Sequence, residues 1–175
     1  TGRTDEVISP ELKGAGHHLI LLRPCLTEDG LPETASLLSI FQKVTNLCRS
    51  GHVHAVWACG AHGMAEGILK MALGNHLGVR IEESVPLSEL FSTLYGAFLM
   101  EVDPEVTGHL IGQVISQPVI GYRGAGQDEI ALDTLRSLWE NKLEPVYPCN
   151  LQTPSVHIPN LQSSFSAWPS PAVLV

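Results

Sequence analysis

The chain has 175 residues, of which 44% are hydrophobic and 16% are charged, and its formal net charge is −8. This length suits one domain of ordinary size with its own core, followed by a tail. The lysines and arginines are scattered singly and form no basic stripe for a nucleic-acid backbone, and no apolar run approaches the roughly 20 residues that span a bilayer. We expect a cytoplasmic protein without nucleic-acid or membrane partners, and the low share of charge indicates a surface that another part of a protein covers.

The hydrophobic pattern predicts helices interleaved with strands. Strands are expected over residues 17–23, 53–59, 77–82, 96–102, 109–116 and 118–123. Helices are expected over residues 33–49, 64–73, 87–92 and 128–142. The last two strands follow one another closely, as in a hairpin. This order predicts an α+β fold with three α/β/α layers, in which helices flank a mixed sheet of about six strands.

Small and polar residues predict where the helices end. Gly51 is placed to terminate the helix over 33–49, and Gly74 and Asn75 are placed to stop the next one. Asp128 is expected to cap the last helix.

The sequence also predicts three segments. Residues 1–16 form a lead-in and residues 17–144 form the domain. Residues 145–175 form a proline-rich linker, because no charged residue follows Glu144 and six prolines interrupt the rest.

The two remaining features are the start of the chain and its cysteines. The sequence starts at Thr1 and shows neither an initiator methionine nor a signal peptide, so we expect a piece of a longer protein. Cys25, Cys48, Cys59 and Cys149 form no CxxC pair. We interpret them as reduced thiols that mostly pack as small buried hydrophobes.

The segment Gly60-Ala61-His62-Gly63 is the strongest candidate for chemistry. A strand leads into it and a helix follows, so free amides at the helix start and the helix dipole favour a phosphate there. We therefore predict that these four residues bind phosphate or a nucleotide. Glu66, one turn further on, is a candidate ligand for magnesium. The alternatives are a tight turn that needs its glycines for geometry and a solvent-facing carboxylate at a helix start.

Other chemical patterns are weaker or missing. His17, His18, His52 and His54 are too far apart in sequence for a usual zinc pattern, so a metal site there is not expected. Neither a P-loop nor a GxGxxG motif occurs. No nucleophile is indicated, and Cys149 lies in a proline-bounded segment. We assign no catalytic residue.

Several segments, taken in order, resemble one known family. They are Ser9-Pro10-Glu11-Leu12-Lys13, the strand HLILL, the helix that ends at Gly51, and the run AVWACGAHGMAEGILKMALGNHLGVRIE over residues 55–82. Near the end, LRSLWE and LEPVYP over residues 135–148 also match. Together they resemble the C-terminal domain of the aminoimidazole ribonucleotide synthetase superfamily, and within it the synthetase region of the phosphoribosylformylglycinamidine synthases.

The resemblance implies a fragment of an ATP-dependent C–N ligase of purine biosynthesis. That enzyme uses ATP, Mg²⁺ and glutamine-derived ammonia to amidate formylglycinamide ribonucleotide. The implied partners are an N-terminal synthetase domain and a glutaminase domain of the same chain, which residues 145–175 would lead toward. The isolated chain is then expected to be inactive, and to self-associate through the face that the N-terminal domain would cover.

One departure from the family keeps alternatives open. Many members carry D-x-S-D-G-G at the turn, whereas residues 58–63 (ACGAHG) retain only the final glycine. No carboxylate remains in that segment. The alternatives are a sister enzyme, of the aminoimidazole ribonucleotide synthetase or selenophosphate synthetase type, and a non-catalytic structural domain of a larger chain.

Overall fold

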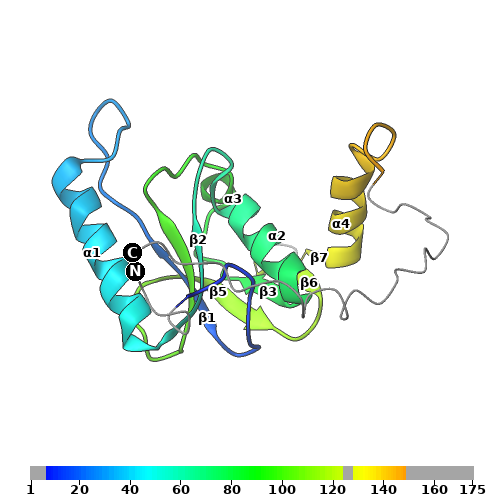
Figure 1. Cartoon of the computed structure of the whole chain (residues 1–175), viewed down its shortest axis with the longest axis horizontal. Coiled ribbons are helices and arrows are strands. Elements are labelled where there is room, and N and C mark those ends of the chain that lie inside the picture. The colour runs from blue at the N-terminus through cyan, green and yellow to red at the C-terminus, as the bar shows by residue number, and fades with distance from the viewer. Residues whose placement is uncertain (1–6, 124–127, 149–175) are drawn as a thin grey trace, which may run out of the picture. The chain divides into compact units, whose positions relative to one another are not determined.

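The computed structural model describes residues 7–123 and 128–148, and Cys149 lies outside them (Figure 1). The chain divides into two compact units, Thr1–Trp139 and Glu140–Val175. The sheet and the sites described below belong to the first unit. The three segments predicted from the sequence stay predictions. No helix of the described part is both long and apolar enough to cross a membrane.

A single mixed sheet forms the centre of the first unit. The described residues give seven strands in the order β2-β4-β1-β5-β3-β6-β7. Their bounds are β1 His18–Leu22, β2 Val53–Ala58, β3 Gly78–Ile81, β4 Phe98–Val102, β5 His109–Ile115, β6 Val119–Tyr122 and β7 Glu129–Ala131. Strands β3 and β6 pair in parallel, and the other five described pairs are antiparallel. The predicted mixed sheet is confirmed, with one strand more than expected.

Helices cover both faces of this sheet, which confirms the three predicted layers. Figure 1 shows α1 (Thr34–Ser50) on one side of the sheet and α2 (Gly63–Asn75) with α3 (Leu87–Leu90) on the other. The period of two along β1 explains the two cores. Leu19 and Leu21 face α2 and join the larger cluster, whereas Ile20 and Leu22 face α1 and join the smaller one.

Two features near the C-terminal side of the sheet correct the sequence prediction. The strands β5 and β6 do not form a hairpin, because β3 lies between them and pairs with both. Gly78 permits this insertion, since a Cβ there would collide with the carbonyl oxygens of Gln117 and Val119. The helix expected from residue 128 begins later: α4 spans Leu132–Asn141, and the residues before it form β7.

The helix ends follow the prediction only in part. Gly51 ends α1 with φ 83°, in the left-handed region, as predicted. Gly74 does not stop α2, which runs on to Asn75 and ends at His76 with φ 56°. Gly74 is instead a packing position, because a Cβ there would collide with the side chain of Glu11.

The described cysteines are free thiols that differ in burial. Cys59 is buried, Cys48 is half-buried and Cys25 is exposed. The expectation of mostly buried thiols therefore fails for Cys25. Burial raises the pKa of the Cys59 thiol to about 11, so this sulfur is not a reactive thiolate at neutral pH.

Candidate functional site

The Gly60–Gly63 turn joins β2 to α2 and is braced by the segment that follows α3. The carbonyl oxygen of Gly60 accepts hydrogen bonds from the amides of Gly63 (3.2 Å) and Leu94 (3.1 Å). The carbonyl oxygen of Ala61 accepts one from the Thr93 hydroxyl (3.2 Å). These contacts fix the path of the turn into the helix.

The two glycines of this turn have different roles. Gly63 has φ 64°, and a Cβ there would lie 2.7 Å from the carbonyl oxygen of Leu90 and collide with that of Ser92. Gly60 has no atom within 4 Å of such a Cβ. Packing therefore explains Gly63 fully, whereas Gly60 leaves open space in which another molecule could approach the backbone.

The side chains of this helix start form a short polar chain. His62 is 81% exposed, and its Nδ1 lies 3.5 Å from Oε2 of Glu66. Lys70 Nζ donates a 2.7 Å hydrogen bond to Oε1 of Glu66 and lies 5.2 Å from the centre of the Trp57 ring. This hydrogen bond is the main reason that the pKa of Glu66 is lowered. A magnesium ion would compete with Lys70 for this carboxylate, and the role of Glu66 as a metal ligand stays a prediction.

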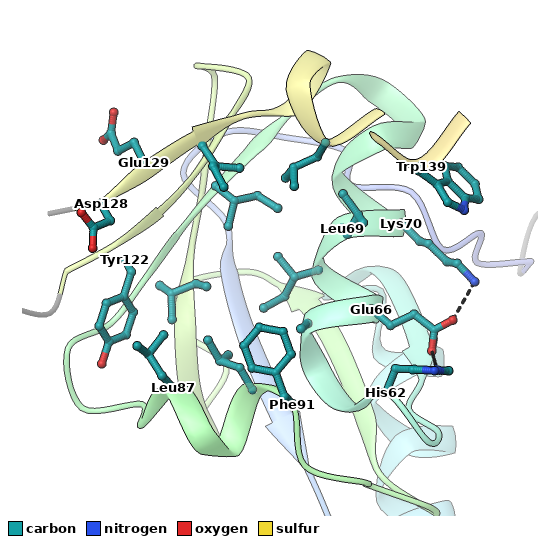
Figure 2. Close-up of a pocket in the computed structure, with 17 residues that line it drawn as sticks. His62, Glu66, Leu69, Lys70, Leu87, Phe91, Tyr122, Asp128, Glu129 and Trp139 are labelled. Atoms are coloured by element: carbon teal, nitrogen blue, oxygen red, sulfur yellow. Dashed lines mark hydrogen bonds and ion pairs between the residues drawn. The ribbon is translucent and has the colours of Figure 1, made fainter. Parts of the chain in front are cut away.

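A cavity of about 700 Å³ opens beside these side chains (Figure 2). Its wall is largely apolar and combines α2, the end of β3, α3, β6, β7 and α4. Figure 2 shows Glu66 between Lys70 and His62 at one side of the cavity, and Asp128 and Glu129 at the opposite side. Of the predicted site residues, His62 and Glu66 line the cavity, whereas Gly60, Ala61 and Gly63 lie in the adjoining turn.

The charges around this cavity limit what it can bind. Among the described residues that line it, Lys70 is the only lysine or arginine, whereas Glu66, Asp128 and Glu129 are acidic. Lys70 is already paired with Glu66, and Arg80 pairs with Glu129 from outside the lining (3.0 Å). A triphosphate needs cations or a metal to balance its charge. The cavity therefore lacks the charge balance for ATP on its own.

The sequence did not predict the cavity, although the spacing of two residues on its wall predicts that they interact. Glu66 and Lys70 are four residues apart, and that spacing alone predicts a helical ion pair. Phe91 and Trp139 line the cavity from elsewhere in the chain. No local pattern could place these two aromatic residues beside α2, because tertiary packing brings them there.

The histidines also lie differently from the expectation. The rings of His17 and His54 stack with centroids 4.1 Å apart and an angle of 11° between their planes. Asp103 joins them, so that one ligand atom from each of the three residues lies within 4.8 Å of the others. Separation along the sequence therefore did not predict that these side chains lie close together in space. They do so because the sheet places the start of β1 and the start of β2 at the same end of β4.

No family model matches the chain, and neither does any curated protein sequence. Solved structures do match, and they show a shared fold: the chain has the fold of a domain that is present in phosphoribosylformylglycinamidine synthase II and in HypE. The fold that the sequence resemblance implied is thus confirmed.

Phosphoribosylformylglycinamidine synthase and HypE structures are among the matches. Phosphoribosylformylglycinamidine synthase II of Thermotoga maritima has a TM-score of 0.64 and 13% identity, over 77% of this chain and 28% of that chain. T. maritima PurL complexed with ATP has a TM-score of 0.60 and 15% identity, over 77% and 28%. Escherichia coli HypE has a TM-score of 0.53 and 15% identity, over 71% and 51%. The chain thus spans 28% of the first match's length, and these likenesses establish the fold.

Proposed function

We propose that the chain is one domain of a phosphoribosylformylglycinamidine synthase, an ATP- and glutamine-dependent C–N ligase of purine biosynthesis. In this reaction ATP phosphorylates the amide oxygen of formylglycinamide ribonucleotide, and ammonia then displaces phosphate to give the amidine. The chain would supply one wall of the synthetase. An N-terminal synthetase domain would supply most of the ATP and Mg²⁺ contacts, and a glutaminase domain would supply ammonia.

One observation carries this proposal. The likeness to phosphoribosylformylglycinamidine synthase II extends over 77% of the chain with a TM-score of 0.64. It adds to the ordered sequence resemblance over residues 8–148. The likeness to HypE is lower, with a TM-score of 0.53, and this difference favours the synthase over HypE.

The cavity supports a division of labour between domains. Its acidic groups and its one paired lysine do not suit a triphosphate, whereas its apolar rim suits contact with protein. Leu87, Phe91 and Trp139 on its wall are each more than half exposed. A face of this kind is typical of a surface that another domain covers. We infer that the N-terminal synthetase domain covers it and that the isolated chain is inactive.

The second candidate is a structural domain without a direct role in catalysis. It is favoured by the turn, where residues 58–63 contain no carboxylate and Gly63 is explained by packing. It is also favoured by Glu66, whose carboxylate is already bound by Lys70. The two candidate functions predict different outcomes at Gly60. A synthase domain would bind a phosphate in the open space there, whereas a structural domain would leave it empty.

Nucleotide titration followed by NMR separates them. The amides of residues 60–64 are monitored while Mg-ATP or inorganic phosphate is added, first with the chain alone and then with a synthetase domain joined before it. The proposal expects saturable shifts at these amides in the joined protein, and a Gly60→Ala variant that weakens them about tenfold. Gly51, at the far end of α1, is the control amide. Absence of a response in both proteins would overturn the assignment of the turn.

A further inference from the structure

Two histidines and an aspartate meet at one end of the sheet, away from the cavity described above. His17 precedes β1, His54 lies on β2 and Asp103 follows β4, and β4 is the strand between β1 and β2. Their side chains are only partly exposed, at 25% for His17, 29% for His54 and 25% for Asp103. The group is therefore held in a partly sheltered position.

His17 is oriented by a buried carboxylate. Its Nδ1 lies 2.8 Å from Oε1 of Glu101, which is fully buried. Glu101 also accepts hydrogen bonds from the amides of Lys13 (2.8 Å) and Gly14 (2.9 Å). With the Nδ1 proton donated to Glu101, Nε2 carries the lone pair. A carboxylate that fixes the tautomer of a histidine in this way is a common feature behind metal-binding imidazoles.

His54 is directed by an irregularity in the sheet. Val53 pairs with Val102 and Ala55 pairs with Glu101, so His54 is an extra residue in β2. Such a bulge redirects a side chain that strict alternation would place elsewhere. In this chain it places the His54 ring on that of His17, and Nε2 of His54 lies 2.6 Å from Oδ1 of Asp103. Oδ2 of Asp103 contacts Nδ1 of His52 at 2.8 Å.

We propose that His17, His54 and Asp103 bind one zinc ion. Two imidazoles and a carboxylate are a usual donor set for Zn²⁺, and three protein ligands leave a fourth position for water. The nitrogen donors also favour zinc over Mg²⁺ and Ca²⁺, which prefer oxygen ligands.

One of the three residues also borders a cavity. His54 lines a cavity of about 440 Å³ together with Lys13 and Arg49, whereas His17 and Asp103 do not line it. The ammonium group of Lys13 is paired with Oε1 of Glu11 at 2.6 Å. Binding requires both rings to turn out of their parallel stack, so that a nitrogen lone pair of each points at the same ion. The contact between His54 and Asp103 is then replaced by shared coordination of the metal. This site does not depend on the proposed synthase function.

Calorimetric titration of the chain with zinc chloride tests the proposal. The protein carries no histidine tag, is first treated with a chelator, and is kept at pH 7.5 in a buffer that does not bind metals. We expect one zinc per chain, at least tenfold weaker binding in His17→Ala and in His54→Ala, and unchanged binding in His109→Ala. His109 is an exposed histidine on β5 and serves as the matched control. Magnesium chloride should give no binding at this group.

Two outcomes would overturn the proposal. One is zinc affinity that stays the same in His17→Ala or His54→Ala, and the other is the absence of any zinc binding to the unaltered chain. Circular dichroism shows whether each variant is folded. If one is not, the imidazole NMR signals of the unaltered chain decide: zinc should shift those of His17 and His54 and leave that of His109 in place, and the reverse pattern contradicts the site.

Discussion

Gly63 and Leu90 approach each other so closely that a Cβ on Gly63 would lie 2.7 Å from the Leu90 carbonyl oxygen. Gly63 also has φ 64°, which side chains other than glycine rarely adopt. We predict that Gly63→Ala lowers the free energy of unfolding by about 2–4 kcal/mol through strain and overpacking. Urea denaturation measures this loss.

Gly60→Ala is the matched control for that change. It lies in the same turn, with no positive φ and with open space where a Cβ would stand. Its free energy of unfolding should change by less than about 1 kcal/mol. Equal losses in the two variants would mean that the turn is not braced against residues 90–92 as described.

The ion pair between Glu66 and Lys70 predicts a pH effect. The pKa of Glu66 is held below its ordinary value, chiefly by the Lys70 hydrogen bond. A lowered folded-state pKa contributes stability that is present above the unfolded value and is lost as the pH falls through the folded value. In Lys70→Met the pKa of Glu66 should rise toward the ordinary value of a glutamate, as NMR titration of its carboxyl carbon would show.

The ion pair between Glu66 and Lys70 should contribute little to the free energy of unfolding. Both side chains are partly exposed, so at neutral pH the ion pair should make the unaltered chain more stable than Lys70→Met by no more than about 1 kcal/mol. This difference in the free energy of unfolding should shrink below about pH 4. Lys43→Met is the control, because Lys43 is exposed on α1 and has no ion pair among the described residues. A pKa for Glu66 that does not move in Lys70→Met would show that the pair does not form in solution.

The apolar cavity predicts self-association of the isolated chain. Leu87 on its wall is 55% exposed, and Leu38 on α1, away from the cavity, is 62% exposed. Both Leu87→Ser and Leu38→Ser should change the free energy of unfolding by about 0.5 kcal/mol or less, because both sites are surface positions. Leu87→Ser should lower the average mass in sedimentation at high concentration, whereas Leu38→Ser should not. A monomeric unaltered chain, or equal effects of the two variants, would contradict this use of the cavity.

The layers of the fold could be predicted from the sequence because hydrophobic periodicity is a local signal. The apolar run HLILL and the helical spacing of α1 need no knowledge of their neighbours. The pairing of strands was harder, since β3 enters between β5 and β6 through a close contact at Gly78 that no local pattern reveals. Ile130 fits the helical spacing of the apolar residues over 128–142, so the sequence predicts a helix there, but pairing with β6 overrides that preference at residues 129–131.

The candidate site was predictable to a smaller extent. Its turn was located from glycines between a strand and a helix, a local pattern that the structure places as expected. The cavity beside it depends on Phe91 and Trp139, which only the tertiary fold brings to α2. The stack of His17 on His54 likewise depends on a bulge in β2, and bulges have no reliable sequence signal at a single histidine.

The most direct test of the central claim is an assay of ADP formation from ATP and Mg²⁺ in the presence of formylglycinamide ribonucleotide and ammonia. We predict no activity from the chain alone. The chain joined to an N-terminal synthetase domain should form ADP only when both the ribonucleotide and ammonia are present. ADP formation by the chain alone, or activity of the joined protein that does not require the ribonucleotide, would contradict the assignment to phosphoribosylformylglycinamidine synthase.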